Sequence, residues 1–104
     1  MSHYLADNPA PEDVAALPGL TLLEFGVDWC PHCQAAQPWL AQFLAARPQL
    51  RHLAAEDGKG RRLGRLYGVK LWPSFILLRD GVEIGRAVRP QRLAELEAMV
   101  SGWL

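Results

Sequence analysis

Residues 26–34 read GVDWCPHCQ and contain both cysteines of this 104-residue chain. Cys30 and Cys33 are separated only by a proline and a histidine. The preceding run, 20-LTLLEFGV-27, is almost wholly apolar, which is typical of a strand buried on both faces. Residues 31–46 are rich in Ala, Gln and Leu, with apolar residues at helical spacing. We therefore expect the cysteine pair where a buried strand ends and a helix begins.

A cysteine at a helix N-terminus meets unpaired backbone N–H groups and the positive end of the helix dipole. We therefore expect Cys30 to have a lowered pKa and to act as a nucleophile. Pro31 stiffens the loop, and His32 adds a positive charge or a donor beside the thiolate. Cys33 is then placed to attack a mixed disulfide on Cys30 and to release the product.

Three other interpretations of the cysteine pair are weaker. A structural zinc site needs four ligands, and the pair supplies two. Of the three histidines, His32 lies inside the loop, while His3 and His52 are isolated in the sequence, so no metal is expected. A structural disulfide over so short a loop constrains almost no chain. Two inert buried cysteines do not suit the tryptophan, proline and histidine around them.

The rest of the chain alternates helical and extended patterns, which predicts an α/β fold with a central mixed sheet and helices on both faces. A hairpin turn is expected at Asp80-Gly81 and a kink at Pro38. Leu93, Leu96, Val100 and Trp103 give the last helix one apolar face. The expected elements, all in one domain of residues 1–104, are helix 9–17, strand 20–27, helix 31–46, strand 50–55, helix 61–67, strands within 74–88 and a helix from residue 90.

Composition excludes several classes of protein. Eleven basic residues balance eleven acidic ones, which argues against a nucleic-acid-binding protein or a polybasic membrane binder. The N-terminal residues, MSHYLADNPAPEDV, have neither a basic nor an apolar region of a signal peptide, and no apolar run approaches membrane-spanning length. A cytoplasmic protein is expected, although a mature secreted chain would have a similar composition.

The motif 29-WCPHC-33 resembles the WCxxC active-site loop of thioredoxin-fold oxidoreductases. The resemblance extends from about Thr21 to Leu104, because LLEFGVDWC, Pro38, 67-YGVKLWPSFILL-78, RDGVE and a last helix follow in the family's order. It implies a thioredoxin fold and a thiol–disulfide oxidoreductase that needs no cofactor beyond the two cysteines.

The resemblance also implies roles for individual residues. Cys30 is expected to be the exposed attacking thiol and Cys33 the buried resolving thiol. Pro73 is expected to be a cis-proline facing the pair, with the backbone of Trp72 pairing to an extended substrate. Trp29 is expected to be a surface contact beside the thiol.

Glu24 matches the acid that the family buries behind the cysteines. A carboxylate in the run LLEFGV is costly to bury in its ionised form, so we expect a raised pKa and a general acid or base for Cys33. A solvent-facing glutamate on a half-exposed strand is the alternative. The lysine that the family often places near this acid is not evident, and His52 or Leu53 falls there. The family's late groove glycine is replaced near Val88–Arg89.

The Pro-His pair between the cysteines leaves open whether the protein reduces or oxidises its substrates. General thioredoxins carry Gly-Pro there, whereas Pro-His resembles the strongly oxidising Dsb-type bacterial oxidases, whose helical insertion this chain has no room for. We expect dithiol–disulfide exchange with protein substrates and a redox partner protein, by a monomer. The alternatives are a thioredoxin-fold binding or assembly module without turnover and a disulfide-donating oxidase in an oxidising compartment.

Overall fold

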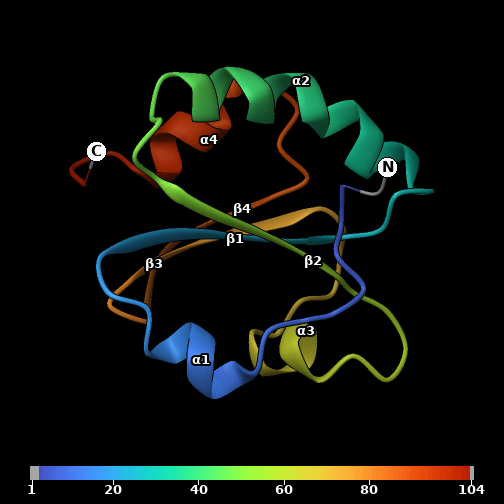
Figure 1. Cartoon of the computed structure of the whole chain (residues 1–104). Helices are drawn as coiled ribbons and strands as arrows, with labels where there is room; N and C mark the ends of the chain where they lie inside the picture. The colour runs from blue at the N-terminus through green and yellow to red at the C-terminus, as the bar shows by residue number, and fades with distance from the viewer. Residues whose placement is uncertain (1–2, 104) are drawn as a thin grey trace.

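A four-stranded mixed sheet forms the centre of the computed structural model, which describes residues 3–103 (Figure 1). The strand order is β2-β1-β3-β4, and the strands are β1 (Leu20–Gly26), β2 (Arg51–Glu56), β3 (Ser74–Arg79) and β4 (Val82–Val88). β1 and β2 are parallel, while β3 is antiparallel to both β1 and β4. The parallel pair follows from the helical crossover between its strands, and the antiparallel pair from the hairpin.

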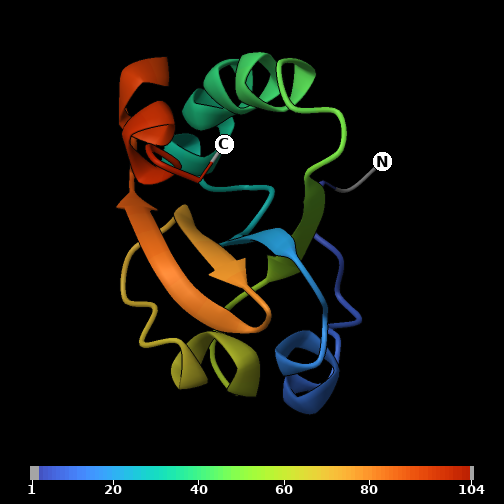
Figure 2. The same ribbon diagram turned by 90° about the vertical axis from the view of Figure 1, so that its left-hand side faces the viewer.

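Two helices cover each face of the sheet (Figures 1 and 2). α2 (Pro31–Ala45) and α4 (Leu93–Met99) lie on one face, and α1 (Pro11–Ala15) and α3 (Arg62–Leu66) lie on the other. The expected α/β class and element order are therefore confirmed. α2 continues through Pro38 as one helix.

β1 is buried on both faces, as its apolar sequence predicts. Its residues alternate between two core clusters. Leu22 packs with Phe43 and Leu96 on the side of α2 and α4, while Leu23 packs with Leu63 on the side of α3. Because Glu24 follows Leu22 by two positions, the same alternation directs its side chain toward the face that α2 covers.

The turn between β3 and β4 lies where the sequence placed it. Asp80 and Gly81 have φ values of 50° and 81°, the left-handed pair that a two-residue hairpin turn requires. A Cβ on Gly81 would lie 2.0 Å from the carbonyl oxygen of Ala15. Glycine is therefore required at this turn both for its backbone conformation and for the approach of α1.

The last helix is shorter than expected. α4 ends at Met99, Val100 has left the helical conformation, and Gly102 reverses the chain with φ 87°. Trp103 therefore does not continue the apolar face of α4, and the prediction that it does is wrong. Its ring is 42% exposed and lies 5.0 Å below the guanidinium of Arg79. Among residues 3–103, no helix is long and apolar enough to cross a membrane.

Leu96→Ala tests the packing of α4 on the sheet. Leu96 is fully buried, so the truncation should reduce the free energy of unfolding by about 3 kcal/mol through lost burial and a cavity. Leu66→Ala is the matched control, because Leu66 is also helical but is 56% exposed. It should change the stability by no more than about 0.5–1 kcal/mol in urea unfolding. Equal losses in the two variants would mean that α4 does not depend on this contact.

Candidate active site

The two cysteines lie at the N-terminus of α2, as expected. Cys30 is the residue that precedes the first helical turn, with extended backbone angles, and Pro31 occupies the first helical position. Cys33 lies in that first turn. Both side chains are thiols in this structure and are not joined by a disulfide.

The exposure of Cys30 is smaller than expected. Its exposed fraction is 6%, against 1% for Cys33, so the prediction of an exposed thiol is wrong in degree. The physical reason is that Trp72 packs against the cluster that contains the two cysteines. Trp29 next to Cys30 is 72% exposed, in agreement with its expected place on the surface. Access to Cys30 is therefore confined to a narrow part of its surface.

The pKa of Cys30 is lowered. Burial alone would raise it, but the backbone N–H and the side chain of Cys33, the backbone N–H of His32 and the charge of Arg89 together outweigh burial. The helix N-terminus therefore stabilises the thiolate as expected. His32 contributes through its backbone, whereas its side chain is exposed.

The pKa of Cys33 is raised to about 11, and burial is the main cause. The thiol is enclosed by Tyr4 from the N-terminal segment and by β1. A Cβ on Gly26 would lie 2.6 Å from the Cys33 sulfur and 2.7 Å from the Tyr4 hydroxyl, so the absence of a side chain at Gly26 makes room for both groups. The Tyr4 hydroxyl is fully buried, and no hydrogen-bond partner for it is found among the described residues.

Two tryptophans form the surface beside Cys30, and the buried Pro73 follows the second of them. The Trp72–Pro73 peptide bond is cis, so this prediction is confirmed. The rings of Trp29 and Trp72 meet edge to face, with their centres 6.0 Å apart. Trp72 is fixed because its Nε1 donates to Asp57 Oδ2 at 2.8 Å.

Arg89 stands where the family's groove glycine was expected to be replaced. Its φ is 48°, a left-handed conformation that favours glycine and is unusual for arginine. The backbone N–H of Arg89 donates to the Pro73 carbonyl at 2.9 Å, and its Nε donates to the Trp72 carbonyl at 2.7 Å. The backbone of Trp72 is expected to pair with a substrate, and its carbonyl is already bonded to Arg89.

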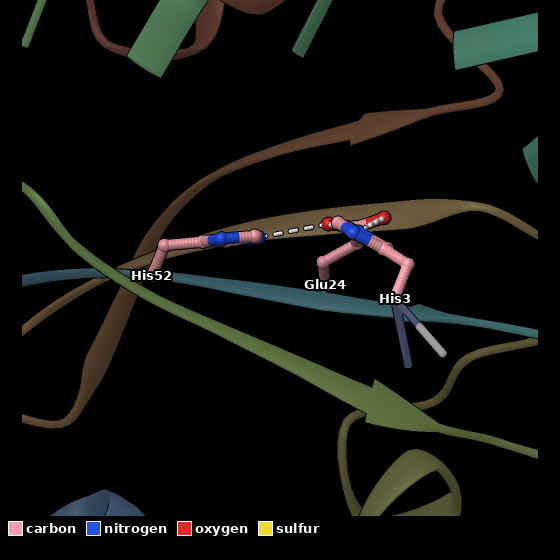
Figure 3. Close-up of side chains that lie close together, drawn as sticks. All are labelled: His3, Glu24 and His52. Carbon is pink, nitrogen blue, oxygen red and sulfur yellow. Dashed lines mark hydrogen bonds and ion pairs between the residues drawn. The ribbon is translucent and has the colours of Figure 1, made fainter. Parts of the chain in front are cut away.

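Glu24 is fully buried behind the cysteine pair, between two histidines (Figure 3). Nε2 of His3 lies 2.9 Å from Oε1 and 3.0 Å from Oε2, and Nε2 of His52 lies 2.8 Å from Oε1. The structure therefore brings together two histidines that are isolated in the sequence. Of His52 and Leu53, the two residues expected where the family often has a lysine, His52 is the one that contacts Glu24.

The expected pKa of Glu24 was wrong in sign. Burial raises the pKa of this carboxyl, but hydrogen bonds from His3 and His52, with the Tyr4 hydroxyl nearby, outweigh burial and lower the pKa to about 2. The same contact with Glu24 raises the pKa of His3. Glu24 is therefore ionised at neutral pH, which removes the reason for expecting a carboxylic acid that exchanges protons with Cys33.

The N-terminal segment completes this cluster, and sequence reasoning missed it. Leu5 forms a parallel bridge with Ala55 of β2. Oδ1 of Asp28 accepts the backbone N–H groups of His3 and Tyr4 at 2.9 and 3.3 Å. No periodic pattern marks residues 3–5, so the only signal available was an unpaired charge in an apolar strand that needs a partner.

Comparisons with known proteins agree with this geometry. The family model described as Thioredoxin matches residues 3–102. A thioredoxin of Chlamydia trachomatis is 33% identical over 70 residues, which cover 67% of this chain and 69% of that protein. Thioredoxin Asp f 28 of Aspergillus fumigatus is 25% identical over 103 residues, 96% of this chain and 95% of that one. The solved structure of reduced thioredoxin 2 from Pseudomonas aeruginosa is 55% identical, covers 94% of this chain and 92% of that chain, and superposes with a TM-score of 0.84.

The chain therefore belongs to the thioredoxin family and has the thioredoxin fold. Its activity is thiol–disulfide exchange by the pair Cys30 and Cys33. Members of this family act on protein disulfides and work with reductase partners.

Labelling of the reduced protein with iodoacetamide at different pH values tests the opposite pKa shifts. Thiolates react and thiols do not, so Cys30, whose pKa is lowered, should be alkylated at neutral pH. Cys33 should stay protonated and unreacted until the pH approaches about 11. Mass spectrometry after short pulses gives the rate at each cysteine, and urea-unfolded protein serves as the control in which the rates converge. Faster labelling of Cys33 at neutral pH would contradict the assignment.

Arg89→Gly separates the charge of the arginine from the helix N-terminus as causes of the low Cys30 pKa. Removing the cation should raise the pH midpoint of Cys30 alkylation, whereas Arg89→Lys should retain most of the effect. Glycine also suits the backbone at φ 48°, so loss of stability should not confuse the result. An unchanged midpoint in Arg89→Gly would leave the hydrogen bonds from Cys33 and from the His32 backbone as the cause.

Proposed function

We propose that Cys30 attacks disulfides of protein substrates and that Cys33 resolves the mixed disulfide. The observation that carries this proposal is the opposite direction of the two pKa shifts. The thiolate is favoured at Cys30, and the protonated thiol is favoured at the more deeply buried Cys33. A nucleophile must be a thiolate and must meet its substrate, and Cys30 satisfies both conditions better.

The exchange proceeds in two steps. The Cys30 thiolate attacks one sulfur of the substrate disulfide, forms a mixed disulfide and releases the other substrate sulfur as a thiolate. Cys33 then loses its proton and attacks the Cys30 sulfur. A Cys30–Cys33 disulfide forms, the second substrate sulfur leaves, and the leaving thiolates take up protons. The substrate gains two electrons and the cysteine pair loses two, which a redox partner restores.

The substrate docks on the surface made by Trp29 and Trp72, next to the buried Pro73. The exposed ring of Trp29 and the edge-to-face contact with Trp72 offer an apolar wall beside Cys30. Because Arg89 already bonds the Trp72 carbonyl, an extended substrate must displace that bond or use another backbone group. The proposed form is a monomer that accepts electrons from a protein of the thioredoxin system. The cytoplasmic location stays a prediction.

A second candidate is a disulfide donor, and the stabilised Cys30 thiolate favours it. Two backbone N–H groups and the Arg89 cation stabilise the thiolate and hence the reduced form. Stabilising the reduced form raises the reduction potential, by about 30 mV for each 1.4 kcal/mol. The reduction potential, measured by equilibration with glutathione buffers, decides between the two. A value near those of cytosolic reductants supports the reductase, and a value well above the cytosolic poise supports the donor.

Cysteine variants test the proposed roles. Cys33→Ser should accumulate mixed disulfides with substrate proteins, because the resolving thiol is absent. Cys30→Ser should abolish insulin reduction and trap nothing. Sodium dodecyl sulfate gels without reductant show the trapped adducts, and added dithiothreitol should release them. The reverse pattern would exchange the two roles. A binding module would give a different result. The wild-type chain would reduce no insulin, and both variants would still bind their partner.

A further inference from the structure

We propose that His3, Glu24 and His52 form a binding site for a divalent zinc ion behind the cysteine pair. The three side chains come from three separate parts of the chain: the N-terminal segment, β1 and β2. Figure 3 shows the two imidazole rings reaching the one carboxylate from opposite sides. Two imidazole nitrogens and a carboxylate oxygen are the donor set that three-ligand zinc sites use, with a fourth position left for water.

The distances suit a zinc ion. Both Nε2 atoms lie within 2.9 Å of the same oxygen, Oε1 of Glu24, and one potential ligand atom from each residue lies within 4.8 Å of the others. In a tetrahedral site with bonds of about 2.0–2.1 Å, ligand atoms are separated by about 3.3 Å. Each Nε2 atom therefore needs to move away from Oε1 by about half an ångström, and the ligand atoms that lie farthest apart need to close from within 4.8 Å to about 3.3 Å. Their half-buried side chains leave room for that movement.

Burial makes this cluster different from an ordinary surface ion pair. Glu24 is fully buried and lies on β1, between β2 and β3. Its carboxylate is therefore held in one position by the surrounding protein. The backbone N–H of His3 is held by Asp28, and His52 lies in β2 paired with Leu22 of β1. The three ligands are therefore positioned by the fold before an ion arrives, which reduces the entropy lost on binding.

A second observation points to a ligand at the same place. The Tyr4 hydroxyl is fully buried, has no hydrogen-bond partner among the described residues, and faces Glu24 and Cys33. Such buried unpaired groups are rare and indicate a partner such as a water molecule or an ion. A cavity of about 50 Å³ lined by His3, Tyr4, Cys33 and Gln37 lies beside them, which is room for a water molecule. That water could occupy the fourth position and bond to the Tyr4 hydroxyl.

Zinc binding would join residue 3 to two strands of the sheet. The ion would hold the N-terminal segment, which carries Tyr4, against Cys33. The cysteine pair is a competing pair of zinc ligands, so the test must remove the thiols. The double variant Cys30→Ser/Cys33→Ser does so and makes the result independent of whether the proposed redox roles are correct.

The first measurement is zinc binding by this thiol-free variant at pH 7.5, in competition with a chromophoric chelator. We expect one zinc ion per chain. Adding His52→Gln should weaken binding at least tenfold, whereas adding His32→Gln should leave it unchanged, because His32 is exposed and outside the cluster. No binding, or equal binding by the two histidine variants, would overturn the proposal and leave the cluster as a buried ion pair.

A second measurement does not depend on a histidine variant being folded. X-ray absorption of the zinc-loaded thiol-free chain should show nitrogen and oxygen at about 2.0–2.1 Å with scattering from two imidazole rings. Zinc should also raise the melting temperature of the thiol-free chain. A spectrum with oxygen ligands alone would mean binding to surface carboxylates and would overturn the proposal.

Discussion

Glu24 is a buried carboxylate in the middle of the central strand, and the surrounding chain is arranged around the need to compensate its charge. An isolated ionised carboxylate in such a place is very unfavourable, so it must be paired or neutralised. Here it is paired with His52 from β2 and with His3 from the N-terminal segment. Asp28 and the bridge of Leu5 to β2 hold that segment in place. These contacts therefore also keep His3 beside the Glu24 carboxylate.

The same arrangement makes the two cysteines chemically unequal. Tyr4 arrives with the N-terminal segment and helps to enclose Cys33, whose burial raises its pKa. Cys30 lies three residues earlier, where backbone N–H groups of the first helical turn and the Arg89 cation favour the thiolate. A two-step exchange requires one cysteine that is a thiolate in the first step and a second cysteine that stays protonated until the second step. The asymmetry arises from position on the helix together with burial.

Most of the fold follows from local patterns, whereas the cluster behind the cysteines does not. The apolar run of β1, the Asp80-Gly81 turn and the place of the cysteine pair depend on neighbouring residues, and the sequence predicted them. Glu24 was predicted to be buried, but its pKa was predicted to rise, because the compensating His3 is 21 positions away and His52 is 28 positions away. The predicted length of α4 was wrong. The apolar spacing suggested a helix through Trp103, but the chain leaves the helix after Met99 and reverses at Gly102.

The two sides of the cysteine pair are built from different parts of the chain. One side consists of Trp29, Trp72 and Arg89, and the other consists of the N-terminal segment, β1 and β2. A left-handed backbone at a non-glycine residue costs about 1 kcal/mol or more and persists only where surrounding contacts hold it. Arg89 is held by Pro73 and Trp72, so its charge is kept beside Cys30 at the expense of local strain. Trp72 also packs against the cluster of Tyr4, Val27 and the two cysteines, so one residue joins the surface beside Cys30 to the enclosure of Cys33.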